Sequence, residues 1–209
     1  MVDSPQDSGD GKARAYWRDS VAEFETPSWS KAMVDLALSL GAYIVCMVTM
    51  YLLVGDHPWI VAVLALPTAG FLLRTFIVFH DCGHGSFVPS ARGNLWIGRL
   101  TALLVWQPYA NWRHNHAVHH GTSGDLDRRG QGDVETITVA EYHARSWKGR
   151  LAYRLFRSPA ILFTIGPLWS LMIGPRFWTK EMRPRQIHSV WLTNVAFVLF
   201  IGGTIAIVG

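Results

Sequence analysis

Residues 36–54 read LALSLGAYIVCMVTMYLLV, a run without a single charged side chain. As an α-helix this run is roughly 28 Å long, close to the thickness of the hydrocarbon core of a membrane. Residues 55–58 (GDHP) indicate a turn, and a second apolar run continues to Phe79. The sequence therefore predicts a transmembrane hairpin that returns His80 to the side of the membrane from which the chain entered.

Local signals predict the details of this hairpin. Thr26 followed by Pro27 is typical of a helix N-terminus, so the first helix is expected to begin there. Pro67 predicts a kink in the second helix, and the long side chain of Arg74 can carry its charge towards the membrane surface. Residues 1–26 are polar and rich in acids, unlike a transit peptide, and are expected to form a mobile tail before a domain at 27–209.

Three later apolar segments differ in length. Residues 95–106 are too short to span a membrane and predict an interfacial or re-entrant helix. Residues 158–174 have Lys and Arg on both flanks, which favours a segment that dips into or lies on the cytoplasmic face. Residues 190–209 are long enough to span. The predicted fold class is an all-α integral membrane protein, with a hairpin, interfacial or re-entrant helices and a C-terminal membrane helix.

The composition agrees with this class. Of 209 residues, 50% are hydrophobic and 16% are charged, whereas soluble domains carry charges at about a quarter of their positions. The 2 cysteines cannot form the disulfide framework of a small extracellular protein. The net charge of +4 is not gathered into the dense basic face that nucleic acid would require, so no nucleic-acid partner is expected.

The histidines point to a metal site. They form two patterns, HDCGH at residues 80–84 and HAVHH at residues 116–120. Residues three and four apart share one face of a helix, so each pattern groups its rings. Crowded neutral imidazoles need a cation to accept their lone pairs, and they suit iron, copper, nickel or zinc. The candidate ligands are His80, His84, His116, His119 and His120.

The other histidines have simpler interpretations. His57, His143 and His188 are isolated and are expected to be hydrogen-bonded residues at the membrane boundary, and His114 is left open. Asp81 is the first candidate to hydrogen-bond a ligand ring, a contact that metal-bound histidines usually need. The chain contains neither Glu-x-x-His, as in soluble di-iron bundles, nor the His-Glu-x-x-His of zinc proteases.

At these residues the chain resembles the membrane fatty acid desaturase family, and in particular its acyl-lipid branch of the omega-6 and omega-3 type. HDCGHGSF at 80–87 is similar to the first histidine box of that branch, and WRHNHAVHH at 112–120 is similar to the second. GDVETITVAEY at 132–142 is similar to the segment downstream of the second box. The resemblance extends in order and spacing from about residue 30 to residue 209.

The resemblance implies an O2-dependent enzyme that introduces a double bond into a lipid-linked acyl chain. The five candidate histidines match ligands of two non-haem iron ions at the cytoplasmic ends of membrane helices. The sequence has no Gly-x-Gly-x-x-Gly fingerprint, so electrons are expected from a ferredoxin, or from cytochrome b5 with its reductase. Trp106, Tyr109 and Trp112 are expected either to line an acyl tunnel or to form an interfacial aromatic belt. A bacterial inner membrane is favoured over an organelle.

The chain departs from the family pattern at one point, because the 209 residues contain no third histidine box. The domain at 27–209 is therefore expected to be partial and C-terminally truncated, which leaves its own activity open. Two alternatives remain. One is a sister di-iron hydroxylase or ketolase, and the other is a non-catalytic truncated membrane protein, including one that binds haem through two histidines.

Overall fold

The computed structural model describes residues 21–130 and 134–208. Most of the expected tail at 1–26 lies outside these residues, which begin near a short 3-10 helix, η1, at Ala22–Phe24. All regular elements in the described ranges are helical, as predicted. After η1 they are α2 (Trp29–Leu36), η2 (Ala37–Gly41), α3 (Ala42–Leu53), α4 (Pro58–His84), α5 (Ala91–Leu104), α6 (Tyr109–Thr122), α7 (Val139–Ala144), α8 (Trp147–Phe156), α9 (Pro159–Phe163), α10 (Ile165–Pro167), η3 (Leu168–Ile173), η4 (Gly174–Arg176) and α11 (Pro184–Val208).

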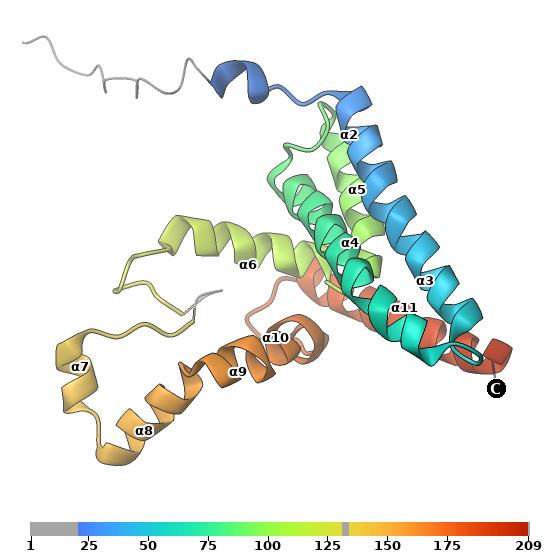
Figure 1. The fold of residues 1–209 in the computed structure, drawn as a ribbon. Coiled ribbons are helices and arrows are strands. Elements are labelled where there is room, and N and C mark those ends of the chain that lie inside the picture. The colour runs from blue at the N-terminus through green and yellow to red at the C-terminus, as the bar shows by residue number, and fades with distance from the viewer. Residues whose placement is uncertain (1–20, 131–133, 209) are drawn as a thin grey trace, which may run out of the picture.

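Three helices are long and apolar enough to cross a membrane. They are Trp29–Leu53, which joins α2, η2 and α3, then Pro58–His84 and Pro184–Ile207. The first two lie side by side as the predicted hairpin, and the third is the predicted C-terminal membrane helix (Figure 1). Many of their large apolar side chains face outward, and Leu66 is 80% exposed. Such surfaces suit lipid, because soluble proteins rarely expose large contiguous apolar patches.

The prediction that the first helix begins at Thr26 and Pro27 is wrong, since α2 begins at Trp29. Ser28 takes the extended N-cap conformation, with φ −129° and ψ 131°, which serine adopts as readily as threonine. Arg74 has a partner within the hairpin, because its guanidinium forms an ion pair with Asp35 and donates to Ser39 Oγ. α4 continues through Pro67 without ending.

The shorter segments match the prediction that they do not span. α5 begins at Ala91, earlier than expected, because the hydroxyl of Ser90 accepts a hydrogen bond from the Gly93 amide and caps the helix. It packs along α4 (Figure 1). Residues 158–174 form the short pieces α9, α10 and η3. A non-helical backbone at Thr164 separates α9 from the continuous α10 and η3, and both parts are too short to cross a membrane.

The core is small and lies where α4, α5 and α6 meet. One cluster joins Val78 and Cys82 of α4 to Phe87 and Val88 of the loop that follows. A neighbouring cluster joins Phe79, Ala102 and Tyr109. In contrast, α7, α8 and α9 extend away from the other helices as an arm (Figure 1). The residues that carry the histidines therefore lie beside the best-packed part of the described chain.

Candidate metal centre

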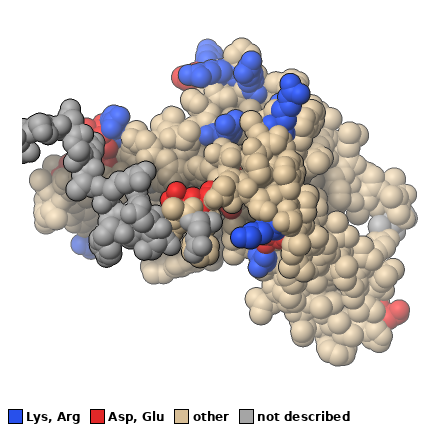
Figure 2. Space-filling model, turned by 90° about the horizontal axis from the view of Figure 1, so that it is seen from above, with Lys and Arg blue, Asp and Glu red and all other residues tan. Residues whose placement is uncertain are grey.

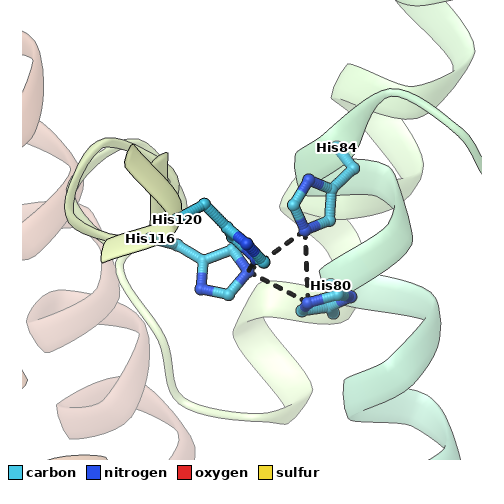
Figure 3. A group of neighbouring side chains, drawn as sticks. All are labelled: His80, His84, His116 and His120. Carbon is cyan, nitrogen blue, oxygen red and sulfur yellow. Dashed lines mark hydrogen bonds between the residues drawn. The ribbon is translucent and has the colours of Figure 1, made fainter. Parts of the chain in front are cut away.

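Two helices deliver the histidines to one place. His80 and His84 lie one turn apart at the C-terminal end of α4, and His116 and His120 lie one turn apart on α6. Their rings point toward one another across the gap between the helices (Figure 3). One nitrogen from each of the four rings lies within 4.8 Å of the others. The spacing read from the sequence is thus reproduced for four of the five candidate ligands.

The distances between these nitrogens suit one metal ion. The Nε2 atom of His116 lies 3.0 Å from His80 Nε2, 3.1 Å from His84 Nε2 and 3.0 Å from His120 Nε2. Imidazole nitrogens bind a metal at about 2.1 Å, which separates neighbouring ligands by roughly 3.0–3.4 Å in octahedral or tetrahedral geometry. The three separations from His116 therefore suit ligands of one bound cation.

The electrostatics of the rings also favour a cation. Burial and the neighbouring imidazoles lower the pKa of His116 to about 4, so its ring is neutral at neutral pH. The Asp81 carboxylate lies 3.0 Å from His80 Nδ1 and can only accept, so that nitrogen donates. With Nδ1 as the donor to Asp81, the Nε2 atom faces the other rings. Asp81 is therefore placed to orient a ligand ring, as a metal-bound histidine requires.

His119 lies outside this converging group. Its ring centroid is 5.9 Å from that of His116 and 5.6 Å from that of His120. Successive residues of a helix are rotated by about 100°, so adjacent His119 and His120 cannot both point at one position. His119 instead lines a cavity of about 660 Å³ beside the cluster, together with Trp112, His116 and residues of the 170–186 segment.

Two glycines shape the end of α4, and one of them allows the close approach of α6. A Cβ atom on Gly83 would lie 2.7 Å from the ring of Trp112, so only glycine allows this contact. Trp112 stacks on His116, with ring centroids 4.3 Å apart. Gly85 ends α4 with a φ of 77°, a left-handed conformation that glycine adopts without strain. Gly83 therefore lets an aromatic ring support a candidate ligand.

The three candidate tunnel residues lie in different places. Trp112 lines the 660 Å³ cavity. Tyr109 is buried, packs on Phe79 and donates its hydroxyl to the Cys82 carbonyl at 3.1 Å. Trp106 packs against Phe197 of α11, with ring centroids 4.7 Å apart. Only Trp112 thus borders both the cavity and the histidine cluster.

Two positioning elements were not predicted from the sequence. The Asn94 side chain accepts from the amides of Phe87 and Val88 and donates to three nearby carbonyls, which fixes the loop after His84. Asn111 accepts from Gln186 at 3.0 Å and ties α6 to α11. The polar amide directly before the apolar run at residues 95–106 is the signal that could have indicated the first of these.

Comparison with known proteins identifies the family. The family model described as fatty acid desaturase matches residues 57–209. The chain belongs to the fatty acid desaturase family. The predicted resemblance to its acyl-lipid branch is confirmed, because several similar proteins are named for desaturation of acyl-lipids. No solved structure matches the chain.

The similar proteins include bacterial desaturases. The chain is 39% identical to a fatty acid desaturase of Bacillus subtilis over 178 residues, which is 85% of this chain and 51% of that protein. It is 33% identical to an sn-1 acyl-lipid omega-3 desaturase (ferredoxin) of a Synechocystis species, over 61% of this chain and 35% of that protein. An sn-1 oleoyl-lipid 12-desaturase of the same genus is 30% identical, over 82% and 46% respectively. The chain thus spans about half, or less, of the length of these relatives.

Proposed function

We propose that this chain supplies histidine ligands to a non-haem iron centre that desaturates the acyl chains of membrane lipids. The observation that carries the proposal is the convergence of His80, His84, His116 and His120 on one point. Membership of the desaturase family supports the reaction, and relatives named for acyl-lipid desaturation support the substrate class.

The donor set fits iron but does not complete a pair of iron ions. Four rings would hold one ion, and His119 is a further candidate ligand on the cavity side. Iron ions usually take more ligands than five imidazoles can provide for two of them. We therefore assign to these residues one part of a di-iron centre.

Bound iron would supply the oxidant, derived from O2, that an unactivated C–H bond requires. Two hydrogens leave adjacent methylenes, and with two further protons and two external electrons they reduce O2 to two water molecules. The residues of this chain would bind the iron and hold its ligand rings in position. Asp81 fixes the His80 ring, Trp112 supports His116, and the 660 Å³ cavity offers a space for a methylene beside the cluster.

The electron donor is proposed to be of the ferredoxin type, because two relatives carry ferredoxin in their names. Cytochrome b5 is the other donor class that the family resemblance implies. We place the histidine cluster on the cytoplasmic face of a bacterial inner membrane, where such a soluble donor can reach it. The match to a Bacillus subtilis protein supports a bacterial setting.

Metal analysis of the purified chain tests the proposal. The chain is expressed with added iron, purified in mild detergent and analysed by elemental mass spectrometry. We expect bound iron in the unmodified chain, its loss in His84→Ala and in His116→Ala, and its retention in His188→Ala, whose ring lies outside the cluster. Equal iron in all four proteins would contradict the assignment.

Lipid analysis tests the reaction. Cells that express the chain with a ferredoxin are examined by gas chromatography of their membrane acyl chains. Unsaturated products are expected to depend on His84, and hydroxylated or ketone products would instead favour a sister activity. Products that persist in His84→Ala would show that this site does not perform the reaction.

A further inference from the structure

A second cavity, of about 920 Å³, lies between α5, α6 and the start of α11. Four arginines line it, one from α5, one from α6 and two that flank Pro184, the first residue of α11. They are Arg99, Arg113, Arg183 and Arg185. The remaining lining includes apolar side chains, among them Leu95 and Ala117. The cavity therefore combines positive charge with apolar walls.

The arginines have no carboxylate partner within the described residues. The cavity lining contains neither Asp nor Glu. Arg113 Nε donates to the Gly83 carbonyl at 3.0 Å, and the Arg99 guanidinium lies 5.1 Å from the centre of the Trp96 ring. Both contacts leave guanidinium donors available. Four like charges around one hollow repel each other, and a bound anion would relieve that repulsion.

The position of the cavity indicates where the anion comes from. The third apolar helix begins at Pro184, so Arg183 and Arg185 lie where this helix enters the membrane. Lipid phosphates lie at this depth, and they attract basic residues near membrane helices.

The shape distinguishes a small ligand from a protein partner. A cavity of this volume is in the range of sites that enclose small molecules. On the face shown in Figure 2, Lys and Arg form separate groups amid a mostly uncharged surface. We propose that the cavity binds the phosphate of a membrane glycerophospholipid, with the four arginines around the phosphate and the acyl chains against the apolar wall.

Native mass spectrometry of the detergent-purified chain tests this site. The probes are phosphatidylglycerol and diacylglycerol with the same acyl chains. The unmodified chain should retain phosphatidylglycerol and not diacylglycerol. The Arg183→Gln/Arg185→Gln double variant should retain about tenfold less phosphatidylglycerol, because two charge-assisted contacts are lost. Arg92→Gln, at an exposed arginine that does not line the cavity, is the matched control and should behave like the unmodified chain.

Further variants and probes make the test independent of any single variant. Arg99→Gln alone should also weaken retention, so the result does not depend on the folding of one variant. The proposal is overturned if all variants retain phosphatidylglycerol equally, or if inorganic phosphate stabilises the chain while the lipid is not retained. It is also overturned if the double variant loses binding to an acidic ferredoxin but keeps the lipid. None of these readouts uses iron or desaturation, so failure here and failure of the proposed function are distinguishable.

Discussion

The two histidine pairs lie on helix ends that are held in place to different extents. After His84, the chain turns back through the loop at residues 85–90, which Asn94 of α5 holds with five hydrogen bonds. After His120, α6 ends in residues that are mostly exposed, and its firm contacts are at its first turn, where Asn111 bonds to Gln186 and Ser189. We call the end of α4 that carries His80 and His84 the fixed half of the site, because its loop holds it in place. The other half is the end of α6 that carries His116 and His120, which has room to adjust its position.

The largest expected effect is on the fixed half. Asn94→Ala would leave the buried amides of Phe87 and Val88 without partners, and each such group costs about 1–3 kcal/mol. We expect the free energy of unfolding to fall by about 2–4 kcal/mol. Thermal unfolding in detergent measures this. Asn115→Ala is the control, because that side chain makes only a 3.5 Å contact to Asn111. Equal losses in the two variants would remove the distinction between the halves.

A matched pair of glycines tests how the halves meet. Gly83→Ala places a Cβ atom against the Trp112 ring, whereas a Cβ atom on Gly121 meets nothing within 4 Å. Overpacking of this kind costs about 1–3 kcal/mol. We expect Gly83→Ala to weaken both stability and iron retention through Trp112 and His116, and Gly121→Ala to leave both unchanged. Iron content after dialysis provides the readout, and full retention by Gly83→Ala would contradict the packing argument.

These residues also show what the sequence could and could not reveal. The hairpin follows from apolar length, and the grouping of His80 with His84, and of His116 with His120, follows from helical spacing. Helical spacing also implies that only one of the adjacent His119 and His120 can join the group. The choice of His120 depends on the direction from which α4 approaches α6, which spacing does not contain. The role of Asn94 is local, because its partners lie within nine residues of it, but it depends on how the loop at residues 85–90 folds. The role of Asn111 and the meeting of the four arginines are tertiary. They became visible only when distant segments were placed together.

A smaller loss of stability is expected when the hydrogen bond from Tyr109 of α6 to the Cys82 carbonyl of α4 is removed. Tyr109→Phe removes the donor to the Cys82 carbonyl and keeps the packing on Phe79. A single neutral hydrogen bond contributes about 0.5–1.5 kcal/mol. We expect a loss of stability in that range with unchanged iron binding. A fall in iron content comparable to that of His84→Ala would instead assign Tyr109 to the site itself.

The smallest effect concerns the arm, far from the fixed half. Contacts with Arg129 and Thr138 lower the pKa of Glu141 to about 2. This pKa is below that of a glutamate in an unfolded chain, about 4.3. The ionised Glu141 therefore stabilises the folded arm fully above pH 4.3, and this contribution is lost as the pH falls toward 2. The protection of the α7 amides against hydrogen exchange, taken relative to their intrinsic exchange rate at each pH, should therefore fall over this interval. Glu141→Gln should abolish this pH dependence of the protection. An unchanged exchange profile in the unmodified chain would contradict the assignment.

The most direct test of the site is X-ray absorption spectroscopy of the iron-loaded chain. Four rings converging on one ion predict a first shell at about 2.1 Å with imidazole scattering beyond it. His120→Ala should lower the imidazole contribution by about one ring of four, and His188→Ala should leave it unchanged. A shell without imidazole scattering, or one that is identical in His120→Ala, would contradict the convergence of the two histidine pairs on a metal.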